Sequence, residues 1–372
     1  MNKIIILHFN PIELYPPVQN VIQYAASHWT GKKIFILTTR AGKLPFEQFN
    51  TDASHISIIR LGQSGPTMSA IKRYTGYIKF YLGTLWFLFI KRPSKVLYYE
   101  TLSSYPVYLY KKWINPKAGI FIHYHEYSSP VEYQQGMRLI RYFHRMEKWL
   151  YPKASWVSHT NEMRMQRFEK DITPAIVNTK YIFPNYPPIS WLRPAKKQMG
   201  NPVKIVYVGA LSLHTMYTKE FADWVLKQQG AVTWDIYTAN IKTDAREYFT
   251  NMSTPLITLH EGIQYQDLPD VLAKYDVGVI LYTGHIDNYI YNAPNKLFEY
   301  MACGLDVWFP DVMKGSLPYV TKDIYPKVIA MDFTKLNQVN LTVLANHDDL
   351  EYRQPGYFCE NLLESLGKQL LS

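Results

Sequence analysis

The segment NAPNKLFEYMACGLDVWF, residues 292–309, predicts a loop, a helix and a buried strand in immediate succession. Pro294 belongs to the loop, and a helix is expected from about residue 295 to residue 303. Gly304 follows at the position where a left-handed residue commonly ends a helix, and residues 306–309 then form a buried strand. A helix that leads directly into a buried strand is typical of layered α/β domains.

The start of this predicted helix is suited to binding an anion. Its first backbone N–H groups have no partner within the helix, and the helix dipole places positive potential there. Lys296 lies in the first turn, where a cation is unfavourable unless an anion is bound. Glu299 follows one turn later and can accept hydrogen bonds from a ribose diol. The same residues are also compatible with an ordinary exposed helix.

The rest of the chain repeats the alternation of strands and helices. Apolar runs without in/out alternation suit strands that are buried on both faces. Each half of the chain is therefore expected to be a doubly wound, Rossmann-like α/β domain. The predicted strands are residues 4–7, 34–38, 56–60, 96–99, 120–123, 155–158, 176–183, 203–208, 233–237, 277–281, 306–309 and 327–331.

A proline-rich segment separates the two halves. Residues 184–202 contain five of the 23 prolines and show no sustained helix or strand period, which predicts an interdomain linker. We expect an N-terminal domain at residues 1–190 and a second domain at 191–355. The apolar spacing of residues 357–371 predicts a C-terminal helix within 356–372 that packs back across the domains.

The charge is unevenly distributed between the halves. The whole chain of 372 residues has a net charge of +10, whereas residues 1–190 hold 24 Lys and Arg against 10 Asp and Glu. Such a basic half attracts nucleic acid, anionic lipid or phosphorylated substrates, although a solvated surface explains it as well. No nucleic-acid-binding module is recognisable, so we expect no nucleic-acid partner.

Composition excludes several other classes of protein. With 47% hydrophobic and 19% charged residues, the chain is neither disordered nor fibrous. Two cysteines without zinc-ligand spacing predict a reducing compartment and no structural metal. The N-terminus lacks the features of a signal peptide, so a cytoplasmic protein is expected.

A helix with both aromatic and basic residues is predicted at residues 68–92. Basic residues border an apolar stripe of helical spacing, formed by Ile71, Tyr74, Ile78, Tyr81, Leu82, Leu85 and Phe89. A helix of this kind can lie in a membrane interface, and a crossover helix of the core has the same stripe. The uncharged run 80–90 is too short to span a bilayer. We expect peripheral association with an anionic membrane, on the inner face of the plasma membrane.

Residues 292–309 resemble the donor-site helix of the GT-B glycosyltransferases, in particular the retaining family 4 (group 1) enzymes of bacterial glycan synthesis. The residues that match the family's pattern are Pro294, Lys296, Glu299, Tyr300, Met301, Ala302, Gly304 and Val307. Further segments resemble the family in the same order, namely residues 123–126, 147–160, 183–185, 206–211, 262–272 and 276–281.

The resemblance implies a GT-B fold, with two Rossmann-like domains facing across a cleft, and a metal-independent retaining transfer. The substrates would be a nucleotide-sugar donor and a glycan or lipid-linked acceptor, in surface polysaccharide synthesis. His125 and Glu126 would orient the sugar and the acceptor in catalysis. The residues implied to bind the donor are Gly209, Lys219, Asn292, Pro294, Asn295, Lys296 and Glu299. No metal and no further cofactor are implied, since an Asp-x-Asp motif is absent.

Two departures from the family pattern leave other functions open. Tyr291 stands where many members have a second glutamate, which leaves the sugar and the stereochemistry of transfer open. The loop at residues 8–11 lacks the family's glycines. The alternatives are a sugar-nucleotide 2-epimerase of the same fold and a catalytically degenerate binding subunit.

Overall fold

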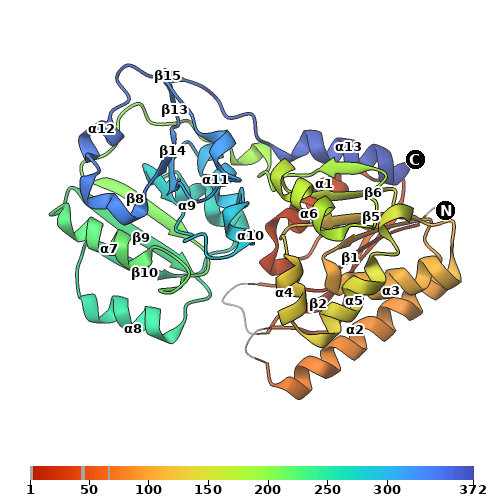
Figure 1. Cartoon of the computed structure of the whole chain (residues 1–372). Coiled ribbons are helices and arrows are strands. Elements are labelled where there is room, and N and C mark those ends of the chain that lie inside the picture. Colours follow the sequence, from red (N-terminus) through yellow and green to blue (C-terminus); the bar gives the residue numbers. More distant parts are fainter. Residues whose placement is uncertain (1–2, 43–46, 66–67) are drawn as a thin grey trace. The chain divides into compact units, whose positions relative to one another are not determined.

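The computed structural model describes residues 3–42, 47–65 and 68–372, which divide into two compact units. The first unit comprises residues 3–42, 48–185 and 359–372. The second comprises residues 186–358 together with Glu47. Each unit is built on its own parallel sheet (Figure 1).

The sheet of the first unit has seven strands. They are β1 (Lys3–His8), β2 (Lys33–Arg40), β3 (Ile56–Gln63), β4 (Lys95–Tyr99), β5 (Gly119–Tyr124), β6 (Trp156–His159) and β7 (Lys180–Ile182). Their order is β3-β2-β1-β4-β5-β6-β7, and all pairs are parallel. This is the doubly wound order of a Rossmann-like domain, so the predicted fold class is confirmed for this half.

Helices connect these strands. They are α1 (Pro16–His28), α2 (Ala70–Lys91), α3 (Ser104–Leu109), α4 (Pro130–Gln135), α5 (Arg138–Glu147), α6 (Glu162–Ile172) and α13 (Cys359–Leu371), with short helical turns η1 (Ile12–Leu14), η2 (Thr101–Ser103), η3 (Tyr110–Ile114) and η4 (Tyr151–Lys153). Several ends follow from local sequence. Ser129 and Glu132 form a capping box at the start of α4, and Asn161 caps α6 through the backbone N–H of Arg164. Arg92, in a left-handed conformation, ends α2.

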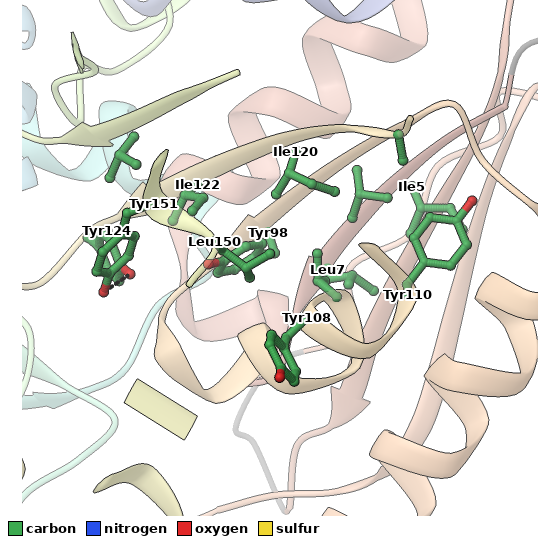
Figure 2. Packing of buried hydrophobic residues seen from close by; sticks show 14 of the residues in the cluster. Ile5, Leu7, Tyr98, Tyr108, Tyr110, Ile120, Ile122, Tyr124, Leu150 and Tyr151 are labelled. Carbon is green, nitrogen blue, oxygen red and sulfur yellow. Dashed lines mark hydrogen bonds between the residues drawn. The ribbon is translucent and has the colours of Figure 1, made fainter. Parts of the chain in front are cut away.

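Tyrosines make up much of one face of this sheet. Alternate residues such as Ile5, Leu7, Ile120 and Ile122 pack against tyrosines of β4, η3 and η4 (Figure 2). Buried Tyr98 donates to Glu147 Oε1 at 2.8 Å, and Tyr110 donates to the carbonyl of Pro93 at 2.7 Å. Because their hydroxyls have partners, these rings can be fully buried. Part of the chain's large tyrosine content therefore stabilises its core.

The C-terminal helix α13 belongs to the first unit. It packs against α1, and its Gln369 is bonded to Trp156 of β6 at 2.5 Å and to Lys95 of β4 at 2.8 Å. Gly367 makes room for the indole of Trp29, since a Cβ there would lie 2.5 Å from Trp29 Nε1. The last segment of the sequence thus completes the domain that the first residues begin.

The sheet of the second unit has six parallel strands. They are β8 (Val203–Val208), β9 (Val232–Thr238), β10 (Ile257–Glu261), β11 (Val277–Val279), β12 (Asp306–Pro310) and β14 (Val328–Met331), and β13 (Ile324–Tyr325) pairs separately with β15 (Glu351–Tyr352). The order β10-β9-β8-β11-β12-β14 is again doubly wound. Its helices are α7 (Thr218–Lys227), α8 (Thr243–Met252), α9 (Leu268–Leu272), α10 (Asp287–Ile290), α11 (Asn295–Ala302) and α12 (Leu341–Ala345), with turns η5 (Ile189–Trp191), η6 (Tyr265–Asp267), η7 (Leu317–Tyr319) and η8 (Phe333–Gln338).

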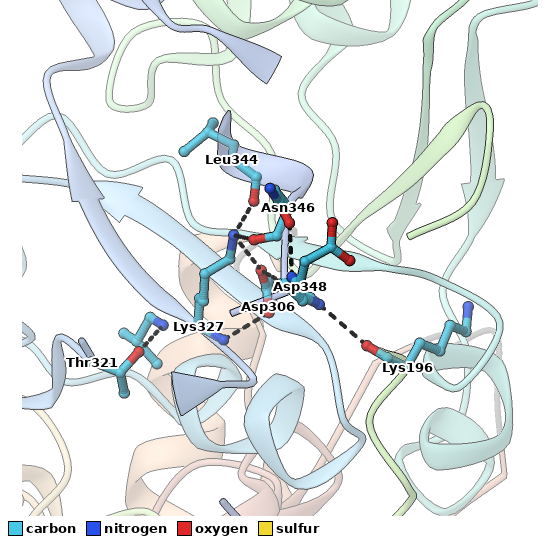
Figure 3. A network of polar contacts seen from close by, with 9 residues as sticks. Lys196, Asp306, Thr321, Lys327, Leu344, Asn346 and Asp348 are labelled. Atoms are coloured by element: carbon cyan, nitrogen blue, oxygen red, sulfur yellow. Dashed lines mark hydrogen bonds and ion pairs between the residues drawn. The ribbon is translucent and has the colours of Figure 1, made fainter. Parts of the chain in front are cut away.

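A buried polar network holds the later segments of this unit together. Asp306, at the start of β12, accepts hydrogen bonds from the backbone N–H of Lys327 at 2.7 Å and pairs with His347 at 2.9 Å (Figure 3). Lys327 also donates to the carbonyl of Asn346 at 3.1 Å. The buried carboxylate therefore has partners for both oxygens, as a buried charge requires.

Two sequence expectations need adjustment in detail. Residues 176–183 were expected to form one strand, but only Lys180–Ile182 pairs as β7. The strand β10 was not expected, because it ends in the polar residues His260 and Glu261. Within the described ranges, none of the helices has the length and apolar character needed to cross a bilayer.

Candidate functional site

The helix α11 is fixed firmly against the sheet of the second unit. The ring of Tyr300 packs where a Cβ at Gly278 of β11 would lie only 2.1 Å away, so this strand position has to be glycine. The Tyr300 hydroxyl accepts a hydrogen bond from the backbone N–H of Val208, the last residue of β8, at 3.1 Å. Gly304, with φ of 77°, ends the helix as the sequence predicts. These contacts position the start of α11 beside the carboxyl end of β8.

No side chain caps the N-terminus of α11. Pro294 occupies the N-cap position and offers no acceptor to the first-turn N–H groups. The preceding loop is held in place instead by its own carbonyls, since Asn292 O accepts a hydrogen bond from Ser316 Oγ at 2.9 Å. A Cβ on Gly315 would lie 2.3 Å from Tyr291 O, so this approach also requires glycine. These two contacts define the path of the loop, and the helix start can accept a ligand's negative charge.

Lys296 lies between two tyrosine rings at this helix start. Its Nζ is 5.5 Å from the ring centroid of Tyr207 and 5.6 Å from that of Tyr282, and it is 3.5 Å from the Tyr282 hydroxyl. Gly209, with φ of 135°, leaves space for the ammonium, since a Cβ there would be 3.0 Å from Nζ. No described carboxylate lies within ion-pair distance of Lys296. The structure thus brings Gly209 and Lys296 together and presents a cation without a paired anion.

Glu299 is buried one helical turn beyond Lys296. It is 9% exposed and accepts a hydrogen bond from the side chain of Tyr265 in η6. Burial raises the pKa of this carboxyl to about 7, although Lys296 and Tyr265 oppose the shift. A buried carboxyl with one protein partner has free acceptor capacity for hydroxyl groups of a ligand.

Lys219 lies elsewhere in the unit. It is exposed near the start of α7, and its Nζ is 5.9 Å from the ring centroid of Tyr248 in α8. Lys296 contacts the Tyr207 and Tyr282 rings instead. Lys219 and Lys296 were both expected to bind the phosphates of the donor. Of the two, Lys296 is the one whose ammonium is held by neighbouring side chains.

In the first unit, His125 follows directly after β5 and is held on every side. Its ring stacks on Tyr99 with centroids 4.9 Å apart, and Nδ1 is 3.1 Å from Asn185 Oδ1. Its backbone N–H donates to Glu100 Oε1 at 2.7 Å, and its carbonyl accepts from Arg164 at 2.6 Å. Nε2 is buried and has no protein partner. A fixed imidazole with one unpaired nitrogen has capacity for a further hydrogen bond.

The electrostatic surroundings keep this histidine neutral. Burial, together with the nearby His123 and His8 rings, places the pKa of His125 well below its usual range. With Asn185 Oδ1 accepting from Nδ1–H, Nε2 carries the lone pair. His125 can therefore accept a hydrogen bond from a hydroxyl at Nε2 and is a poor proton donor.

Glu100 is a residue of this cluster that the sequence did not suggest. It follows directly after β4 and has a φ of 61°, an unusual conformation for a side-chain-bearing residue. Its Oε1 accepts from the backbone N–H groups of both His125 and Glu126, the second at 3.2 Å. Burial and the Glu126 carboxylate raise its pKa to about 8. Glu126, expected beside His125, has an exposed side chain.

The loop after β1 takes a compact shape without glycine. The backbone N–H of Phe9 donates to Ser103 Oγ at 2.9 Å, and Asn10 Nδ2 donates to the Tyr15 hydroxyl at 2.8 Å. His8 Nδ1 is 2.6 Å from Asn10 O, while its Nε2 is buried and unpaired. This loop therefore adds His8 and Tyr15 to the aromatic cluster around His125.

Sequence reasoning missed the residues that arrange the two sites. Tyr207, Tyr265 and Tyr282 surround Lys296 and Glu299, but they come from β8, η6 and the segment after β11. Their one signal is that Tyr207 and Tyr282 each lie near the carboxyl end of a predicted strand, where ligands of doubly wound sheets bind. Among the described residues, no group of three His, Cys, Asp or Glu side chains could hold a metal ion.

Comparison with known proteins identifies the architecture. No protein-family model matches the chain. No curated protein matches its sequence either. Sucrose-phosphate synthase from Thermosynechococcus elongatus aligns with a TM-score of 0.72 at 15% identity, over 99% of this chain and 98% of that one. HepE from Anabaena, solved with UDP and glucose, aligns with a TM-score of 0.65 at 11% identity. The alignment covers 99% of this chain and 95% of HepE. The lipopolysaccharide outer core galactosyltransferase WaaB aligns with a TM-score of 0.61 at 12% identity, over the whole of both chains.

The chain has the GT-B fold. The similarity covers nearly the whole length of each of these proteins, so both Rossmann-like units and their order along the chain are shared. At these identities the likeness concerns fold, and the roles of individual residues depend on the geometry described above. The start of α11 and the ring of His125 are two places where hydrogen-bonding groups have no side-chain partner.

Proposed function

We propose that this protein is a glycosyltransferase that moves a sugar from a nucleotide-sugar donor to a glycan or lipid-linked acceptor. The observation that supports it most is the uncapped start of α11 with Lys296 fixed beside it and Glu299 one turn away. A diphosphate binds the helix N–H groups and the ammonium, and the ribose hydroxyls bind the buried carboxyl. The neighbours of known name include sucrose-phosphate synthase and a galactosyltransferase, which favours the same reaction class.

The chemical roles follow from where negative charge develops. When the bond from the sugar to the diphosphate breaks, the leaving group gains charge, which the helix start and Lys296 stabilise without a metal ion. We propose that His125 accepts a hydrogen bond from a sugar hydroxyl at Nε2 and so orients the donor. Glu126 is exposed next to it and is proposed to bind the acceptor.

We propose retention of configuration, with the leaving phosphate accepting the acceptor's proton. This is consistent with the neutral, weakly basic His125, since such a mechanism needs no strong base from the protein. The acceptor is proposed to be an intermediate of surface polysaccharide synthesis, which the basic first half of the chain would attract.

The test is mass spectrometry of products from a panel of nucleotide sugars, each with and without lipid-linked acceptors and with EDTA present. We expect free nucleotide and a glycosylated product when donor and acceptor are both present. Conversion of the donor alone into an isomeric nucleotide sugar would instead identify an epimerase. Binding of nucleotides without turnover of any donor would identify a binding subunit.

A further inference from the structure

The outer face of α2 carries large apolar side chains that are exposed to solvent. Its inner face, which includes Phe80, Thr84 and Leu88, is buried. The outer face carries seven large apolar side chains, each at least half exposed, namely Ile71 (78%), Tyr74 (65%), Ile78 (56%), Leu82 (63%), Trp86 (65%), Phe89 (50%) and Ile90 (50%). Their spacing of three or four residues places them on one continuous stripe along the helix.

The stripe is larger than a folded monomer normally exposes. Tyr74, Trp86 and Phe89 alone expose roughly 300–400 Å², taking an aromatic side chain as about 150–250 Å². The largest apolar patch on a typical monomer is about 300–600 Å² in total, and here four aliphatic residues add to the aromatic area. A partner that removes this surface from water is therefore expected.

Charge along the helix identifies the kind of partner. Residues 53–99 contain no Asp or Glu, while they contain seven Lys and Arg, of which Lys72, Arg73, Lys79, Lys91 and Arg92 border the stripe. The Arg92 guanidinium lies 5.8 Å from the ring centroid of Phe89, at the end of the stripe. Protein interfaces are depleted of lysine, whereas long cationic side chains beside apolar and aromatic residues suit the head groups of anionic lipids.

The turn η3 adds a further exposed aromatic residue and a further lysine next to α2. The turn η3 packs against α2, and its Trp113 is 72% exposed. The Nζ of Lys112 lies 5.1 Å from the Trp113 ring. Tryptophan is enriched at membrane interfaces, and lysine is common on the polar side of helices that lie in them.

We propose that α2 lies in the plane of an anionic lipid bilayer, with Ile71, Ile78, Leu82 and Trp86 inserted among the acyl chains. The 22 residues of α2 form a helix about 33 Å long, enough for a stable contact parallel to the surface. The bordering lysines and arginines bind lipid phosphates. This proposal does not depend on the glycosyltransferase activity, although it would place the first unit at the surface where lipid-linked acceptors are found.

The test is flotation of the full chain with vesicles of phosphatidylcholine, with or without phosphatidylglycerol. Wild type is expected to float with the anionic vesicles and to do so less at high salt. The double substitution Ile78→Glu with Leu82→Glu should lower binding at least about tenfold, because two charges enter the acyl region. Ile176→Glu, at an equally exposed site away from α2, is the matched control and should bind as wild type.

Two further measurements keep the outcome decisive. The double variant should keep wild-type circular dichroism and nucleotide binding, because both side chains are already exposed. The separate substitution Lys72→Glu with Arg73→Glu should weaken binding to anionic vesicles without touching the apolar stripe. The proposal is overturned if wild type does not bind at low salt, or if neither variant changes binding. It is also overturned if sedimentation shows a dimer that Ile78→Glu abolishes, since the face would then bind a second copy.

Discussion

The protonation state of Glu299 affects the stability of the folded protein. Its pKa in the folded protein is about 7, above the ordinary value of 4.5, because the carboxyl is buried. The folded protein therefore holds this proton more tightly than the unfolded chain. Its contribution lowers the free energy of unfolding as the pH rises from about 4.5 to about 7.

We predict that Glu299→Gln removes this pH dependence. At pH 8 the variant should be more stable than wild type by up to about 3 kcal/mol. Near pH 4 the free energies of unfolding of the two proteins should become equal. Denaturant unfolding at several pH values measures this. Glu220→Gln, on the exposed surface of α7, is the control and should follow wild type at every pH. A pH-independent difference between Glu299→Gln and wild type would contradict the assignment.

The same substitution, Glu299→Gln, is expected to weaken ligand binding although it stabilises the folded protein at pH 8. Replacing Glu299 by Gln should weaken binding of a nucleoside diphosphate by about 1.5–3 kcal/mol, because charged hydrogen bonds to the ribose are lost. Calorimetric titration measures the affinity. Affinity equal to that of wild type would show that the ribose is bound elsewhere.

Lys296 and Lys219 make a direct comparison possible. Lys296→Ala should reduce diphosphate affinity at least about tenfold and leave the affinity for the nucleoside unchanged, because the proposed ligand contact of the ammonium is with phosphate alone. Lys219→Ala should have a smaller effect, since Lys219 is exposed on α7. Lys227→Ala, also exposed on α7, is the control. A larger loss for Lys219→Ala than for Lys296→Ala would reverse the assignment.

Part of this residue-scale description could be predicted from sequence. Gly304, Lys296 and Glu299 are within one short segment, so their relation is set by helical geometry alone. Tyr207 and Tyr282 could not be placed beside Lys296, because their meeting depends on β8 pairing with β11. The backbone conformation of Glu100 likewise has no sequence pattern that predicts it.

At the scale of elements, the packing of α11 on β11 is the feature that positions the proposed donor site. Gly278→Ala would place a methyl group about 2.1 Å from the Tyr300 ring, so the helix must move. We predict a loss of about 1–3 kcal/mol in stability and a parallel loss of nucleotide affinity. Chemical denaturation and calorimetric titration test it.

The control for this prediction is Gly356→Ala, at a position with no atom near the added methyl group. It should change neither quantity by more than about 0.5 kcal/mol. Loss of stability with full nucleotide affinity in Gly278→Ala would show that the position of α11 does not govern binding.

Most elements were predictable because strands buried on both faces have continuous apolar runs. The helix α2 shows the limit of that reasoning. It is apolar around most of its circumference, so the sequence predicted the stripe but could not tell which side faces the sheet. Tyr81 of the predicted stripe is buried, whereas Ile71, Ile78 and Leu82 are exposed.

At the scale of the whole molecule, the chain returns to the first unit at its end. Leu366 of α13 is 1% exposed, and α13 contacts α1, β4 and β6. We predict that Leu366→Ala destabilises the first unit by about 2–5 kcal/mol, because a buried cavity is created. Hydrogen exchange should accelerate in α1, β4 and β6 and remain unchanged in β8 and β9. The exposed Asn361→Ala is the control. Faster exchange confined to the second unit would contradict the placement of α13.

The two halves of the molecule also differ in chemistry. The basic first half contains the neutral His125 cluster and the helix α2, which we propose to bind lipid, while the second half, with a net charge of −4, contains Lys296 and the start of α11. The two proposed ligands therefore rest on different evidence, which is charge composition for the first half and local helix geometry for the second.

A crystal structure of the protein with a bound nucleoside diphosphate tests the central claim most directly. It should show the diphosphate at the N-terminus of α11, within hydrogen-bonding distance of Lys296 Nζ, and the ribose hydroxyls on the Glu299 carboxyl. A nucleotide bound at any other place, or an empty site at saturating nucleotide, would contradict the account.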